Sequence, residues 1–209
     1  MLRVIRTNEE MAAKNGSDPW LVLYREAWLR TLVMDFAGAQ RVCDELMRRS
    51  VYPTGQAQTI GRLAAGFEAL DQGRNDEGLR CFEHVRDPMQ TPKFFLHWYW
   101  RLHAHVGLTR AWLQSGHVTN ARREADGLVE AACATADPNL QALAWDTRAQ
   151  VAIAESNWND ARHSIGYALA ALRSTDTPTS AWRVHGTAWD LHRRAGQRDV
   201  AAAHRASAL

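Results

Sequence analysis

The sequence predicts an all-α fold, an α-α superhelix or solenoid of about five helix-turn-helix repeats. A small residue recurs about every forty positions, and internal periods of roughly 20–50 residues are typical of stacked repeats. The residues at this position are Ala39, Gly78, Ala121, Ala161 and Ala201. A turn residue stands five positions before each of them, namely Met34, Gly73, Gly116, Ser156 and Gly196. Between the turns the apolar residues have helical spacing, and no run is typical of a strand.

The helices can be assigned in chain order from turn and start signals. In four places a proline follows a capping residue, which suits the first turn of a helix: Asp18-Pro19, Thr91-Pro92, Asp137-Pro138 and Thr177-Pro178. We expect the first helices of the five units at 19–33, 56–72, 93–114, 143–152 and 182–196. The second helices are expected after the turns 34–35 and 73–75, ending at Arg49 and Val85, and then at 119–134, 161–172 and 201–208.

The domain organisation follows from these units. Residues 1–18 are expected to be an N-terminal tail or a partial helix, and 19–209 a single superhelical domain. The sequence stops inside the last expected helix, at Ala206-Ser207-Ala208-Leu209. Repeat arrays usually end in a polar capping helix, so we expect either a fragment of a longer protein or an end that a partner or a second copy covers. The alternative is that the arginines of the last helix make a cap unnecessary.

Composition narrows the class of protein. The 25 basic and 23 acidic residues give a net charge of +2, which favours neither nucleic acid nor an anionic membrane as a partner. The three cysteines form no CxxC motif, which predicts reduced thiols and a cytoplasmic location. The N-terminus has charges where a signal peptide would be apolar, and no apolar run is long enough for a membrane span.

No motif for catalysis, a cofactor or a metal is recognisable. Gly61 to Phe67 has the glycine spacing of a phosphate-binding loop, but Phe67 stands where the lysine is required. His103 and His105 lie two residues apart on a helix and therefore point to different faces. We expect His97, His103, His185 and His192 to be surface or packing residues rather than metal ligands, and the protein to have no enzymatic activity, cofactor or metal.

The units resemble tetratricopeptide repeats in the residues of their helix crossings. That motif has a small residue seven positions before the turn, and here the positions hold Ala27, Gly66, Thr109, Ala149 and, as a departure, Trp189. A last apolar position follows at Leu46, Val85, Leu128, Ala168 and Ala208. The long pitch is similar to the repeat regions of bacterial transcription activators, signalling ATPases and kinases. The resemblance implies helices that cross closely where side chains are small.

The resemblance also implies a concave groove lined by the first helices, which holds an extended peptide or a partner helix. The matching groove candidates are Tyr24, Trp28, Leu63, Phe67, Tyr99, His103, Arg110, Gln150, Asp190 and Arg194, with Asp146, Gly186 and Arg193 at equivalent positions. This groove would be aromatic towards the N-terminus and charged towards the C-terminus. The alternative for Trp28 and Phe67 is a place in the core between repeats.

The aromatic segment 94–100 needs separate assignment, because its side chains cannot all face inward on one helix. We expect Phe94, Trp98 and Leu102 to face the core together with His105 and Trp112. Tyr99 and His103 are expected to point towards the groove. Trp100 lies on a third face, where burial against a neighbouring helix is favoured over a partner contact.

The predicted function is that of a non-enzymatic protein-protein interaction module, a bacterial regulatory or scaffold segment that binds a protein or peptide partner. Two alternatives remain open at this point. One is a peptide or small-ligand sensor region of a signalling or transcription regulator. The other is a self-associating structural protein that forms a homodimer through its C-terminal repeat.

Overall fold

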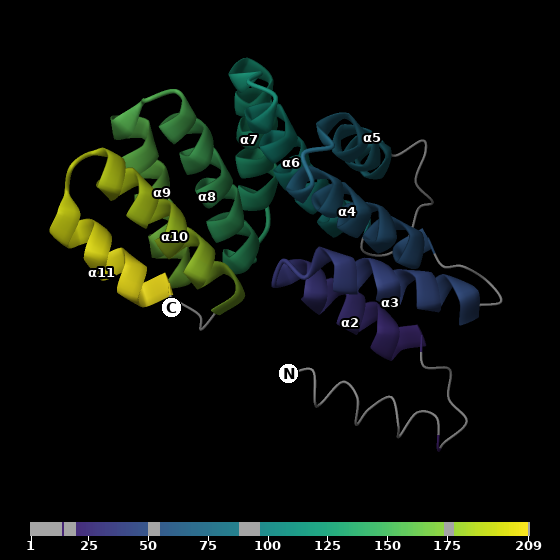
Figure 1. Cartoon of the computed structure of the whole chain (residues 1–209). Helices are drawn as coiled ribbons and strands as arrows, with labels where there is room; N and C mark the ends of the chain where they lie inside the picture. Colours follow the sequence, from purple (N-terminus) through teal and green to yellow (C-terminus); the bar gives the residue numbers. More distant parts are fainter. Residues whose placement is uncertain (1–13, 15–19, 50–54, 88–96, 174–177, 209) are drawn as a thin grey trace. The chain divides into compact units, whose positions relative to one another are not determined.

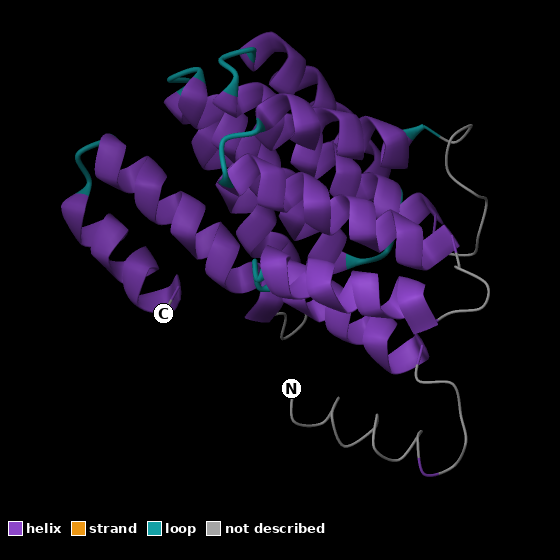
Figure 2. Cartoon of the chain, turned by 45° about the vertical axis from the view of Figure 1, so that its right-hand side comes forward, coloured by secondary structure: helices purple, strands orange, loops and turns teal. Residues whose placement is uncertain are grey.

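The computed structural model describes residues 14, 20–49, 55–87, 97–173 and 178–208, and these residues form helices and turns without a strand (Figure 2). Ten helices are assigned in this part of the chain (Figure 1). The helices are α2 (Trp20–Leu32), α3 (Phe36–Arg49), α4 (Gly55–Asp71), α5 (Asn75–Arg86), α6 (His97–Gln114), α7 (Val118–Cys133), α8 (Pro138–Ala154), α9 (Trp158–Leu172), α10 (Pro178–Arg194) and α11 (Arg198–Ala208). The all-α prediction is confirmed for the described residues.

The five predicted turn residues all adopt the same left-handed backbone conformation. Their φ angles lie between 58° at Ser156 and 76° at Gly196. Each turn also closes with the same two backbone hydrogen bonds, as at Ser156, whose N–H donates to the Ile153 carbonyl at 3.0 Å while the Asn157 N–H donates to the Ala152 carbonyl at 2.9 Å. This pair of bonds is the Schellman ending of a helix, in which glycine is favoured at the left-handed position. The sequence period therefore corresponds to one repeated turn.

The small residues that follow the turns are buried, as predicted. Ala39, Ala121 and Ala161 are fully buried, and Gly78 and Ala201 are also in the core. A Cβ added to Gly78 would lie 3.1 Å from the backbone oxygen of Gly66 and 2.7 Å from a Leu70 methyl group. The two helices of the second unit can therefore cross closely only because these positions are small.

The first-helix start signal is confirmed where it can be observed. The Asp137 carboxylate accepts hydrogen bonds from the N–H groups of Asn139 and Leu140, at 2.9 and 3.3 Å, and Pro138 is the first residue of α8. Helix α10 likewise begins at Pro178. The start signals Asp18-Pro19 and Thr91-Pro92, and Thr177 itself, lie outside the described residues.

The chain divides into two compact units, with residues 1–107 in unit 1 and 108–209 in unit 2. The boundary falls within α6. In unit 1, α3 packs against α2 and α4, and α4 packs against α5. In unit 2, consecutive helices from α7 to α11 pack against one another, and α8 also contacts α10. The helices of each unit are therefore packed in chain order, as expected for a helical repeat.

The two cores are built differently. In unit 1 the fully buried ring of Phe82 lies so close to Gly66 and Gly107 that a Cβ at either glycine would overlap it. The core of unit 2 is mainly aliphatic, with Ala149, Ile165 and Leu191 among its members. Trp189, the departure from the small-residue pattern, is 37% exposed, and its neighbour Ala188 is buried instead.

Candidate partner-binding surface

In unit 1 the structure brings three groove candidates together in one aromatic cluster. The ring centroid of Trp28 on α2 lies 4.4 Å from that of His103 and 5.7 Å from that of Tyr99, both on α6. It also lies 4.4 Å from the ring of Trp100, which is buried as predicted. Edge-on arrangements at such distances are favourable for aromatic rings. Trp28, Tyr99 and His103 thus contact one another.

Two further candidates of unit 1, Leu63 and Phe67, are core residues. Leu63 is completely buried, and the buried ring of Phe67 stacks on Phe36 at 5.2 Å and meets the edge of Phe82 at 4.9 Å. We therefore remove both residues from the candidate surface. The backbone of Tyr24 lies in α2, but its side chain is outside what the structure describes.

The assignment of the aromatic segment needs one correction. Trp98 was expected in the core, yet its side chain is 49% exposed and touches only the ring of Tyr99 among the aromatic contacts of the described residues. Leu102 is buried as expected, and Phe94 lies outside the described residues. Trp98 lies in the first turn of α6, one helical turn before the buried Leu102, so the core covers this helix face at Leu102 but not at Trp98.

In unit 2 a polar cluster connects α8 with α10. Asp146 on α8 is only 2% exposed, and its Oδ2 accepts a hydrogen bond of 3.0 Å from Nε2 of the exposed Gln150. The same Nε2 lies 3.4 Å from the hydroxyl of Thr187 on α10. The Thr187 hydroxyl also hydrogen bonds to the Asp146 carboxylate. Gln150, a predicted groove residue, therefore covers the carboxylate of Asp146, which was also assigned to the groove face but is buried.

Two arginines complete this cluster, which we call the Asp146 cluster (Arg110, Asp146, Gln150, Arg183 and Thr187). Burial raises the pKa of Asp146 to about 6, opposed by the Thr187 hydrogen bond, the charge of Arg183 and the Gln150 amide. Burial also lowers the pKa of Arg183. The negative charge of Asp146 raises this pKa, whereas the positive charge of Arg110 lowers it further. Arg110 on α6 and Arg183 on α10 therefore lie near enough to each other for their charges to interact.

The remaining groove candidates, Asp190 and Arg194, lie on α10 and bind each other. The Asp190 carboxylate accepts from Arg193 at 2.6 Å and from Arg194 at 2.8 Å. Burial alone would raise the pKa of Asp190, but the hydrogen bonds from the two arginines lower it below its usual value. This group carries a net positive charge on α10, in agreement with the predicted charged character of the C-terminal units.

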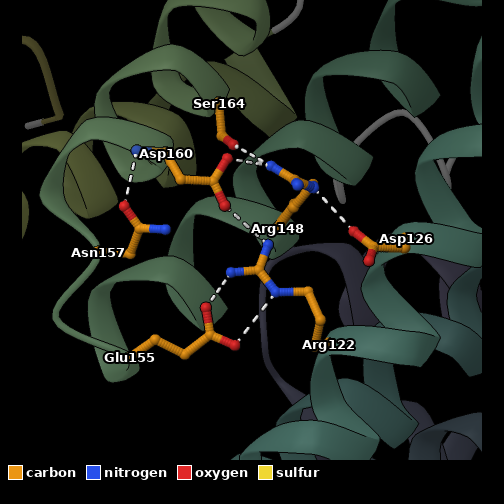
Figure 3. Close-up of polar contacts among 7 residues, drawn as sticks. All are labelled: Arg122, Asp126, Arg148, Glu155, Asn157, Asp160 and Ser164. Atoms are coloured by element: carbon orange, nitrogen blue, oxygen red, sulfur yellow. Dashed lines mark hydrogen bonds and ion pairs between the residues drawn. The ribbon is translucent and has the colours of Figure 1, made fainter.

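Sequence reasoning missed an ion-pair network that joins α7, α8 and α9 (Figure 3). Arg122 on α7 pairs with Glu155 and, at 2.8 Å, with Asp160 on α9. Arg148 on α8 pairs with the same Asp160 and, at 2.8 Å, with Asp126 on α7. Burial would raise the pKa of Asp160, but both guanidinium groups lower it.

This network has a structural role, because its members link three successive helices of unit 2. A signal for it was present in the sequence. Arg122 directly follows the repeated Ala121, and Asp160 directly precedes the repeated Ala161. Opposite charges beside equivalent alanines of adjacent units predict an ion pair between their second helices.

The histidines of the C-terminal unit pack against one another. Nδ1 of His185 lies 2.9 Å from Nδ1 of His204, and the ring of His192 stacks on that of His204 at 5.4 Å.

Within the described part of the chain, no three His, Cys, Asp or Glu side chains are arranged to hold a metal ion. The three cysteines are free thiols. None of the described helices combines the length and the apolar character that crossing a membrane requires.

Comparisons of the chain with protein-family models, with curated proteins and with solved structures gave no match. The chemistry of the surface must therefore be inferred from its side chains. The Asp146 cluster offers guanidinium groups and an amide, which bind carboxylates and peptide groups.

Proposed function

We propose that the chain is a non-enzymatic protein-protein interaction module of the tetratricopeptide-repeat type, a regulatory or scaffold segment. Unit 2 would bind an acidic peptide segment of a partner on the face formed by Arg110 of α6, Asp146 and Gln150 of α8, and Arg183 of α10. The observation that carries the proposal is the Asp146 cluster, which gathers polar side chains from three successive first helices.

The repeated turns support a scaffold role. The same Schellman ending occurs at Met34, Gly73, Gly116, Ser156 and Gly196, and a buried small residue follows each turn. Such a repeat places the first helices of successive units side by side, as with α8 and α10 in unit 2. Equivalent positions of these helices then lie on one surface. Binding specificity then depends on which side chains occupy these positions.

The charges of the cluster indicate an anionic partner group. Arg110 and Arg183 place two positive charges close together, and Arg194 lies on the same helix as Arg183. A guanidinium group recognises a carboxylate through paired N–H donors, which gives both energy and direction. An acidic side chain or a C-terminal carboxylate is therefore the expected contact.

Selection from a display library of random peptides tests this function. We expect peptides rich in Asp and Glu to be enriched on the wild-type protein, and Arg110→Glu to weaken their affinity at least tenfold because it reverses one charge of the cluster. The affinity is measured by fluorescence anisotropy of one enriched peptide. Arg162→Glu is the matched control, since Arg162 is exposed on α9 and donates a hydrogen bond of 3.0 Å to Asn159 on the same helix.

Two results would contradict the proposal. One is the absence of any enriched peptide on a correctly folded wild-type protein. The other is an equal loss of affinity in Arg110→Glu and Arg162→Glu, which would indicate nonspecific attraction between opposite net charges. Circular dichroism of each variant checks that the helices are retained.

A further inference from the structure

Helix α11 packs against α10 through a small contact face (Figure 1). Within α11 the residues that are not exposed lie on one side of the helix: Ala201 is buried, and His204 and Ala208 are half-buried. The second helices of three other units each bury a large apolar side chain, namely Phe82 on α5, Leu128 on α7 and Ile165 on α9. The largest side chain on the contact face of α11 is instead that of His204.

His204 lies between two histidines of α10. Its Nδ1 is 2.9 Å from Nδ1 of His185, and its ring is stacked on that of His192, with the centroids 5.4 Å apart and the planes 6° from parallel. His185 and His192 stand two turns apart on α10 and therefore share one face of that helix. The attachment of α11 thus depends on three imidazole rings in contact.

The contact between His185 and His204 limits how many protons the two rings can hold. In a hydrogen bond between two Nδ1 atoms, one nitrogen donates its N–H and the other accepts with a lone pair, so the accepting ring must be neutral. A second proton removes that lone pair and places two positive charges side by side. The contact therefore tolerates at most one positive charge on the two rings.

His192 does not relieve this limit. Its Nδ1 lies 2.6 Å from Oε1 of Gln197, an oxygen that can only accept, so the bond is kept when His192 is protonated. A protonated His192 then adds a further positive charge beside the ring of His204.

The charged groups around the three histidines offer no compensating carboxylate. On α10, Asp190 is bound by Arg193 and Arg194. On α8 and α9, Asp146 is bonded to Gln150 and Thr187, and Asp160 is paired with Arg122 and Arg148. The other charged or titratable side chains of α9 and α11 are exposed: Arg162, His163, Tyr167, Arg173, Arg198, Asp199 and Arg205.

We propose that α11 is a pH-sensitive helix, which separates from α10 when His185 and His204 are both protonated. Separation uncovers the face of α10 that carries His185 and His192. This switch is independent of the acidic-peptide site, because none of its three histidines belongs to the Asp146 cluster.

The direction of the pH dependence follows from the attached state. Burial lowers the pKa of His185 below its ordinary value of 6.5. Burial, and then the charges of His185 and His192, lower the pKa of His204. The detached helix therefore binds protons more readily than the attached one just below pH 6.5. By linkage, attachment is complete above pH 6.5 and weakens as the pH falls below it.

Hydrogen exchange of the intact protein, followed by mass spectrometry, tests the release. Peptides from α11 and α9 are compared in the same sample at pH 7.5 and pH 5.0, and each rate is divided by the intrinsic rate at that pH. We expect the protection of α11 to fall at least tenfold at pH 5.0, while α9 keeps its protection because it buries Ile165.

His204→Leu removes the titration and supplies an apolar side chain of the kind that other second helices bury. We expect α11 of this variant to be protected equally at both pH values. His163→Leu, which replaces an exposed histidine of α9, is the matched control and keeps the wild-type fall. An equal fall in His204→Leu would overturn the proposal, as would a wild-type α11 whose protection is the same at both pH values.

NMR titration of the imidazole groups in the wild type gives a check that does not depend on how a variant folds. We expect His185 and His204 to become protonated below pH 6.5, over the same range in which α11 loses its protection. A loss of protection while either ring is still neutral, or protonation of both rings without any loss, contradicts the switch.

Discussion

Replacement of Phe82 by alanine is expected to lower the free energy of unfolding of unit 1 by about 3–5 kcal/mol, the usual cost of removing a fully buried phenylalanine. The ring is completely buried on α5 and contacts Phe67 of α4 at 4.9 Å. It also fills the space that Gly66 of α4 and Gly107 of α6 leave free. The loss therefore removes packing against two neighbouring helices at once. Urea unfolding followed by circular dichroism measures it.

A second substitution distinguishes this packing from a general loss of hydrophobicity. Gly107→Ala should destabilise the wild type, because its Cβ would overlap the Phe82 ring, and should be tolerated in the Phe82→Ala background. Trp98→Ala, at an exposed position, should change stability little. If Gly107→Ala costs the same with and without the Phe82 ring, the proposed fit between the ring and the glycine is wrong.

The second large effect concerns pH and Asp146. Burial raises the pKa of its carboxyl to about 6, from an ordinary value of 3.8 for aspartate. Below pH 3.8 the carboxyl is protonated in both the folded and the unfolded chain, so its ionisation does not lower the free energy of unfolding. As the pH rises towards 6 the unfolded carboxyl ionises first, and the folded state loses stability relative to it. Above pH 6 the loss is complete, at about 3 kcal/mol from a difference of about two pKa units.

Asp146→Asn removes this titration. We expect the stability of the variant relative to wild type to increase between pH 4 and pH 7 by an amount approaching about 3 kcal/mol. Urea unfolding at pH 4, 5, 6 and 7 measures the difference, and Asp199→Asn, which replaces an exposed aspartate, is the control. A constant difference across this range, or one that decreases as the pH rises, would contradict a pKa of Asp146 that burial raises in the folded chain.

The turns and crossings could be predicted from sequence because local geometry determines them. A left-handed residue at a helix end favours glycine, and the period then identified Met34 and Ser156 as equivalents that lack it. The crossing positions followed from the same period, since only a small residue fits where Gly78 approaches the Gly66 backbone. Trp189 departed from this pattern because its helix buries the adjacent Ala188 instead.

The side-chain contacts between helices could not be predicted in the same way. Whether Phe67 faces a groove or the core depends on how α3 and α5 pack against α4. The spacing of apolar residues within α4 does not reveal this packing. Asp146 was assigned to the groove face, but its burial depends on Thr187 and Arg183 of the next first helix. Among the groove candidates, Arg110 and Gln150 remain accessible enough to serve the proposed function, since Arg110 is half-buried and Gln150 exposed.

If one turn-centred unit repeats five times, glycine at the two turns that lack it should stabilise the chain. A non-glycine residue in the left-handed conformation costs roughly 1 kcal/mol. Met34→Gly and Ser156→Gly are therefore each expected to raise the free energy of unfolding by about 0.5–1 kcal/mol in urea titrations, whereas Glu155→Gly, one residue before the turn, lowers it. A loss of stability in both Met34→Gly and Ser156→Gly would show that these positions are not equivalents of Gly73, Gly116 and Gly196, and would contradict the repeat.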